Sequence, residues 1–143
     1  MQQTLQLASV ELSDGGCQLF LDGCIGRKKL RFLVDTGASR TVFDEGALLK
    51  RFPDMYFHPG DVLTVGFQDQ LANSREVEII GLKFGRISIA TFDAIAVDLA
   101  YVNKTYSKFG LPPIHGIIGS ELLIRHKAVM NFSRQTLCIK TLE

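Results

Sequence analysis

Short apolar stretches alternate with glycine, proline and polar residues along the whole chain, a pattern typical of a mostly β protein. Residues 17–21 and 30–34 are the first clear strand candidates, and Gly26 with the two basic residues after it supplies the turn of a hairpin between them. Residues 30–34 are almost continuously apolar, which predicts a strand buried on both faces. This strand runs directly into Asp35, so the carboxylate leaves a rigid part of the core.

One or two short helices and several further strands complete the predicted pattern. Residues 44–53 begin with acidic side chains, end with basic ones and stop at Pro53, as a short helix does. Residues 62–65 and 76–80 flank the polar stretch 68–74, which predicts a long exposed hairpin. The remaining expected elements are strands at 86–90 and 94–97, a helix at 121–126 with Ser120 as its N-cap, and a hairpin of 129–132 with 137–140. The first residues, about 15 of them, fit either an interface strand or a frayed end.

Composition and charge narrow the class of protein. The 143 residues suit one domain with one core, and a net charge of +1 offers no basic field to hold a nucleic acid. The sequence has no stretch of about 20 apolar residues for a membrane span and no secretory signal, so we expect a cytoplasmic protein with neither a nucleic-acid nor a membrane partner. Three cysteines without a C-x-x-C pair predict neither disulfides nor a structural zinc site.

Residues 33–39, which contain Asp35-Thr36-Gly37, are the leading candidate for chemistry. In an arbitrary protein this tripeptide is most simply a hydrogen-bonded turn, because glycine permits a tight bend and the aspartate oxygens accept bonds within it. Two features favour catalysis here. An apolar strand delivers the acid, and a second apolar pair followed by glycine, Ile117-Ile118-Gly119, appears much later in the chain.

With the D-T-G first and the apolar pair with glycine later, the sequence resembles the retropepsin-like aspartic peptidases, whose half-pepsin-sized subunits carry a single D-T-G. The resemblance covers about residues 17–139 and includes the hairpin before Asp35, the hairpin around 68–74 in the place of the family's flap, and Gly116-Ile117-Ile118-Gly119 ahead of a short helix. It implies an all-β fold, a retropepsin-like acid protease barrel with one or two short helices, formed by residues 1–143 as one domain. It also implies that Ile117, Ile118 and Gly119 pack beneath the catalytic loop. The flap residues that would contact substrate are Phe67, Gln68, Asp69 and Gln70.

The same resemblance implies an aspartic endopeptidase that needs no metal and no cofactor. Two carboxylates must share a proton, one to activate the water and one to protonate the scissile carbonyl. The chain has a single D-T-G, so the resemblance implies a homodimer that brings Asp35 of both subunits together on a peptide or protein substrate. Thr36 would brace the two loops across the dimer, and Gly37 would allow close approach of backbone and water.

Ala38 predicts that activity extends towards neutral pH, since many pepsin-like enzymes have a serine there whose hydroxyl donates to the ionised carboxylate. The alternative is a catalytically silent retropepsin-like module that dimerises or binds peptides. Asn131 departs from the family, which often places an aspartate there, and we expect a local effect. The histidines, His58, His115 and His126, form no H-E-x-x-H and are predicted to be surface or structural residues.

Overall fold

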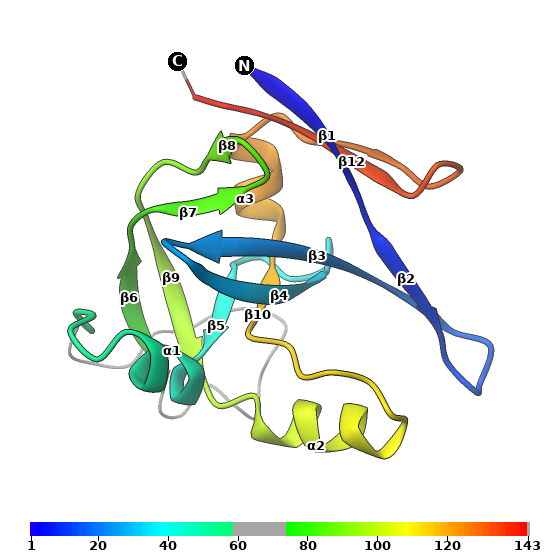
Figure 1. The fold of residues 1–143 in the computed structure, drawn as a ribbon, viewed down its shortest axis with the longest axis horizontal. Coiled ribbons are helices and arrows are strands. Elements are labelled where there is room, and N and C mark those ends of the chain that lie inside the picture. Colours follow the sequence, from blue (N-terminus) through cyan, green and yellow to red (C-terminus); the bar gives the residue numbers. More distant parts are fainter. Residues whose placement is uncertain (59–73, 143) are drawn as a thin grey trace.

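A computed structural model describes residues 1–58 and 74–142 and shows a curled, mostly β structure with three short helices in these ranges (Figure 1). The larger sheet has nine strands, with the path β6-β9-β5-β10-β4-β3-β7-β8 and β2 paired to β3. The smaller sheet has the order β1-β12-β11. The elements in chain order are β1 (Gln2–Gln6), β2 (Ala8–Glu11), β3 (Cys17–Ile25), β4 (Lys28–Val34), β5 (Val42–Asp44), α1 (Glu45–Arg51), β6 (Arg75–Ile79), β7 (Leu82–Phe84), β8 (Ile87–Ser88), β9 (Phe92–Val97), α2 (Ala100–Lys108), β10 (Gly116–Ile118), α3 (Ser120–Arg125), β11 (Val129–Asn131) and β12 (Thr136–Lys140).

The predicted mostly β fold class is confirmed, and the first hairpin forms where the sequence places it. Strands β3 and β4 are antiparallel, with Ile25 opposite Lys28, so the connection is a two-residue turn. Gly26 in that turn has φ +59°, a left-handed conformation that glycine adopts at low cost. The strand before Asp35 is buried in its middle, where Leu30 and Phe32 are at most 2% exposed.

Helix α1 also follows its sequence signals. Asp44 is its N-cap, and its Oδ2 accepts a hydrogen bond of 3.2 Å from the backbone N–H of Ala47. Lys50 and Arg51 lie in the last turn, next to the negative end of the helix dipole. The helix ends before Pro53, as the sequence predicts.

The structure corrects several boundaries. It has three helices in the described ranges instead of one or two, because α2 was not predicted. The strand predicted at 86–90 is the two-residue β8, and β7 was not predicted. Residues 59–73, with the predicted strand 62–65 and most of the predicted hairpin 68–74, lie outside the described residues. Ser74, the last residue of that predicted exposed hairpin, is buried.

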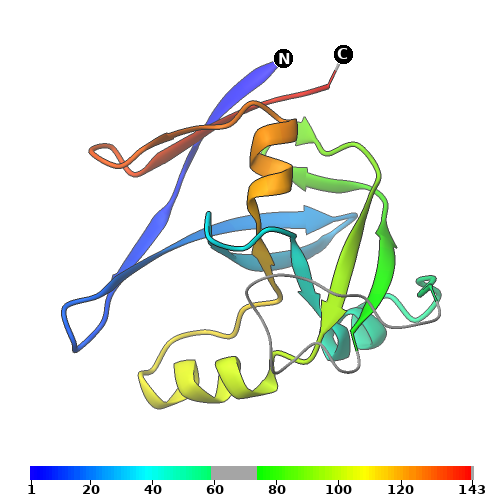
Figure 2. The ribbon, with the colours of Figure 1, turned by 180° about the vertical axis from the view of Figure 1, so that it is seen from behind.

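The first residues form paired strands within the same chain. Strand β1 is antiparallel to β12, and β2 is antiparallel to β3. The two chain ends therefore lie side by side, at the side of the molecule opposite α2 (Figures 1 and 2). The hairpin of β11 and β12 follows, and Asn131 Oδ1 accepts bonds from Ser133 Oγ (2.8 Å) and the Arg134 N–H (3.0 Å). Asn131 thus supports its turn with an oxygen that an aspartate would also supply.

None of the helices in the described ranges is long and apolar enough to span a membrane.

Candidate active site

The Asp35 loop is fixed by strands from distant parts of the sequence. β10 pairs in parallel with β4, with Ile118 opposite Val34, and it is antiparallel to β5. The register continues for one residue, since the Asp35 N–H donates to the Ile118 carbonyl at 3.0 Å. Asp35 Oδ1 accepts from the Gly37 N–H at 2.9 Å, and the Asp35 carbonyl accepts from the Ala38 N–H at 3.1 Å. The half-buried carboxylate therefore starts from a backbone held on both sides.

Gly119 packs against this loop at a distance that no side chain permits. A Cβ at this position would lie 2.6 Å from the carbonyl carbon of Arg40 and 2.9 Å from the Ala38 oxygen. Its N–H donates to Thr41 Oγ1 at 3.0 Å. The backbone after β10 and the backbone after Asp35 are thus in direct contact, with glycine as the spacer.

A buried threonine and a glutamate connect the same two segments, and no pattern in the sequence predicts this pair. Thr41 is fully buried, and its N–H and Oγ1 donate to the two carboxylate oxygens of Glu121, each at 2.5 Å. Glu121 Oε1 also accepts from the Leu122 N–H at 2.9 Å. In the sequence Glu121 is only the first residue of the predicted helix at 121–126, and no local signal relates it to Thr41, which lies 80 residues away.

Ser120 is not the N-cap of α3. The cap position is Gly119, which has no side chain to accept a bond, and Ser120 is the first helical residue. The N–H and Oγ of Ser120 instead donate to the Ala38 carbonyl at 2.8 and 3.2 Å. The start of α3 is therefore stabilised by the loop that carries Asp35.

A hollow of about 330 Å³ lies beside Asp35. Its lining residues are Cys17, Gln18, Leu19, Leu33, Val34, Asp35, Thr36, Met130 and Phe132. Most of these are apolar, and Phe132 is 70% exposed. The carboxylate thus stands at the edge of an open surface that exposes both apolar and polar groups.

Helix α2 reaches this surface through Tyr106. The Tyr106 hydroxyl donates to Gln18 Oε1 at 2.8 Å, and its ring packs edge-on against Phe20, with centroids 6.0 Å apart. Burial raises the pKa of Tyr106, the bond to Gln18 and the charge of Arg31 oppose this, and the negative charge of Asp35 raises it further. The unpredicted helix therefore supports a wall of the hollow and lies within electrostatic range of Asp35.

Some of the other predicted site residues lie around Asp35, and the rest lie outside the described residues. Thr36 and Gly37 are exposed next to Asp35, and the buried residues below the loop are Ala38, Ile117 and Ile118. The predicted flap contacts lie outside the described residues; they are Phe67, Gln68, Asp69 and Gln70.

Two of the histidines hold strands and helices together. His115 lies between β4 and α1, where its Nδ1 accepts from the Arg31 N–H at 2.9 Å and Arg51 Nη2 lies 3.0 Å from its Nε2. Burial, and then the charge of Arg51, lowers the pKa of His115, while Asp44 and Asp22 act weakly in the opposite direction. This histidine is therefore neutral at physiological pH.

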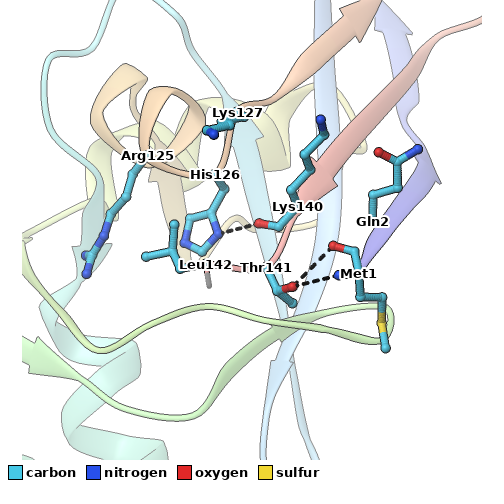
Figure 3. A pocket seen from close by; sticks show the side chains of 8 residues that line it. All are labelled: Met1, Gln2, Arg125, His126, Lys127, Lys140, Thr141 and Leu142. Atoms are coloured by element: carbon cyan, nitrogen blue, oxygen red, sulfur yellow. Dashed lines mark hydrogen bonds between the residues drawn. The ribbon is translucent and has the colours of Figure 1, made fainter.

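His126, which is 2% exposed, joins α3 to β12. Its carbonyl accepts from the Lys140 N–H at 3.0 Å, and its Nδ1 lies 2.8 Å from the Lys140 carbonyl (Figure 3). A hollow of about 580 Å³ opens here between the chain ends, lined by Met1, Gln2, Arg125, His126, Lys127, Lys140, Thr141 and Leu142. It is larger than the hollow beside Asp35, and Asp35 does not line it.

Comparison with known proteins shows the fold. No protein-family model and no curated sequence matches the chain. A retropepsin-like aspartic protease from Rickettsia conorii matches over 97% of this chain and 90% of its own, with a TM-score of 0.51 and 14% identity. The retroviral protease-like domain of Ddi1 from Leishmania major matches over 87% of this chain and 90% of its own, with a TM-score of 0.57 and 13% identity. The chain therefore has a retropepsin-like fold.

Proposed function

We propose that the chain is an aspartic endopeptidase whose active site forms when two copies bring their Asp35 residues together. The observation that carries this proposal is the position of Asp35. It leaves the buried strand β4 with its N–H bonded to Ile118 and its Oδ1 bonded to Gly37, yet the side chain remains partly open to solvent. This backbone support fixes the point from which the carboxylate leaves, which a reaction at that carboxylate requires.

The chemistry requires the second copy. One carboxylate accepts a proton from the attacking water while the other gives a proton to the carbonyl oxygen of the scissile bond, and two like charges so close cannot both ionise. No other D-T-G is available in the chain, so the second acid comes from a partner. In this arrangement Thr36, which is exposed, braces the paired loops, and Gly37 leaves space for the water.

The remaining roles follow from the same arrangement. The support beneath the loop comes from Ala38, Ile117, Ile118 and Gly119. We assign substrate contacts to Phe67, Gln68, Asp69 and Gln70, and we propose that the substrate is an extended peptide that binds as an added strand. The chain's own residues account for each step, so we invoke no metal and no cofactor in the reaction. We also propose a cytoplasmic location, as expected for a chain whose three cysteines form no C-x-x-C pair.

The test is cleavage of a diverse peptide mixture by the purified protein and by Asp35→Asn, from acidic to neutral pH, with products identified by mass spectrometry. The variant keeps the size and a carbonyl oxygen that accepts from Gly37, so its fold should survive. We expect cuts from the wild type alone, with activity extending towards neutral pH because Ala38 gives no hydroxyl to the carboxylate.

Two results would contradict the proposal. Equal cutting by both proteins would assign the activity to a contaminant or another site. Peptide binding with no cutting by either protein would favour a silent module that dimerises or binds peptides. Sedimentation equilibrium adds an independent check, since a protein that stays monomeric at high concentration with substrate cannot form the dyad.

A further inference from the structure

Three metal-ligating side chains meet on the outer face of the strand pair β6 and β9. They are His58, Glu76 and Asp93, and one ligand atom from each lies within 4.8 Å of the other two. His58 Nε2 and Asp93 Oδ1 are 3.6 Å apart. The side chains of His58, Glu76 and Asp93 are 41%, 32% and 49% exposed, so an ion from solvent can reach all three.

The backbone places these donors together. Glu76 belongs to β6 and Asp93 to β9, and the register puts Asp93 diagonal to Glu76 on one face of the antiparallel pair. His58 comes from the segment before residue 59, where its N–H donates to the Glu76 carbonyl at 2.8 Å and Phe57 forms a β-bridge with Val77. The imidazole is thus anchored beside the carboxylates by main-chain contacts.

This face also carries an excess of negative charge. Glu78 is directly opposite Asp93 in the register, and like charges in directly opposite positions destabilise a strand pair. One cation partly offsets this charge, since Arg40 Nη1 lies 3.4 Å from Glu76 Oε1. The other Arg40 nitrogen donates to the Asp93 backbone carbonyl at 2.8 Å, which leaves the Asp93 carboxylate to His58.

We propose that His58, Glu76 and Asp93 bind one zinc ion, with water as the fourth ligand. One imidazole nitrogen and two carboxylate oxygens suit zinc, whereas calcium and magnesium prefer oxygen alone. Ligand atoms of a tetrahedral zinc site lie roughly 3.3 Å apart, given metal–ligand distances of about 2.0–2.2 Å. The His58–Asp93 separation is already close to this, and Glu76 completes the set by rotating its side chain away from Arg40.

The ion would join parts of the chain that the sequence keeps apart. His58 precedes residues 59–73 and Glu76 follows them, so zinc would fasten the two sides of that segment to β9. Arg40, displaced from Glu76, would keep its bond to the Asp93 carbonyl. The site does not include Asp35, and it is independent of the proposed peptidase activity.

The experiment is calorimetric titration of the full, reduced chain with zinc chloride, for the wild type, His58→Gln, Asp93→Asn and Glu78→Gln. All three substituted side chains are partly or fully exposed, and circular dichroism verifies that each variant is folded. We expect one zinc per wild-type chain and a loss of affinity of at least about tenfold in the first two variants, because each loses a direct ligand. Glu78→Gln is the matched control, since it removes a charge from the same face but no ligand, and we expect a change of less than about threefold.

Cobalt distinguishes this site from the three thiols. Cobalt in a nitrogen and oxygen site gives visible bands without the strong thiolate absorption, and we expect these bands to disappear in His58→Gln. Arg40→Gln should tighten zinc binding, because it removes the cation beside Glu76. The proposal is overturned if the His58 and Asp93 variants bind zinc as the wild type does, if Glu78→Gln weakens binding equally, or if the wild type binds zinc no better than at about millimolar concentration.

Discussion

The hydroxyl of Thr41 offers the sharpest test of how the candidate active site is held together. Thr41→Val keeps the shape of the side chain but removes the acceptor of the Gly119 N–H and a donor to Glu121. An unpaired buried N–H costs about 1–3 kcal/mol, and a lost bond to a charged group costs about 1.5–3 kcal/mol. Glu121 keeps two backbone donors, so we expect the free energy of unfolding to fall by about 2–4 kcal/mol in total.

The assay is urea unfolding followed by circular dichroism, with Thr41→Ser as the matched control. At a slope near about 2 kcal/mol per molar urea, the valine variant should lower the midpoint by about 1–2 M. The serine variant keeps the hydroxyl and loses one buried methyl group, worth about 0.8 kcal/mol, so its midpoint should fall by less than half as much. Equal midpoints for the two variants would refute the argument, because they would show that the hydrogen bonds add nothing measurable.

Three further predictions address other parts of the fold. The free energy of unfolding should fall as pH drops below about 6.5, the ordinary pKa of histidine, because the folded state favours neutral His115. In His115→Asn the urea midpoint should depend less steeply on pH. An unchanged slope would show that His115 does not cause the pH dependence. Gly119→Ala should abolish folding or activity, because the added Cβ would lie 2.6 Å from a backbone atom of Arg40. Gly15→Ala is the control, since Gly15 has φ +90° but open space around it, and this variant should lower the melting temperature only modestly. Similar melting temperatures for the two variants would contradict the packing argument. Asp44→Ala should lower the free energy of unfolding, measured with denaturant, by about 1–2 kcal/mol, because Asp44 caps α1 and also accepts from the Leu99 N–H at 3.0 Å. A loss of only about 0.3 kcal/mol would show that neither bond contributes to stability.

The elements that the sequence predicts well are those whose cause is local. Gly26 marks the turn of the first hairpin, and Asp44 with the basic residues of the last turn marks α1. The apolar run of residues 30–34 predicts a buried strand, and the structure buries its middle. In each case neighbouring residues specify the backbone, so a pattern in one stretch of sequence is sufficient.

Helix α2 was missed because its support comes from elsewhere in the chain. Its N-cap, Leu99, makes no side-chain cap bond. The helix is held instead by Tyr106 against Phe20 and Gln18, and by Asn103, whose side chain exchanges two hydrogen bonds with the backbone of Ile114. These tertiary contacts stabilise a helix whose own residues have weak helix propensity, and they cannot be predicted from the local sequence.

In the candidate site, too, residues in local motifs were predicted, and residues that only folding brings together were not. Asp35 and the Ile117-Ile118-Gly119 segment can be identified in the sequence, because each belongs to a short motif and the two motifs follow in a defined order. The Thr41–Glu121 contact is invisible there, since threonine and glutamate are common residues and only folding brings them together. Likewise His58, predicted to be a surface or structural histidine, gains its carboxylate neighbours only through the pairing of β6 and β9.

The insertion of β10 between β4 and β5 also sets an order of events during synthesis. The ribosome makes β4 and β5 first, and the strand that joins them follows only after β6 to β9 and α2. A nascent chain therefore has Asp35 without the Ile118 carbonyl that fixes it and without Gly119 beneath it. Because non-local strand pairing is slow and needs both partners, the loop is completed only after β10 has been made. The order of the strands thereby leaves the candidate active-site loop without its support until β10 has been synthesised.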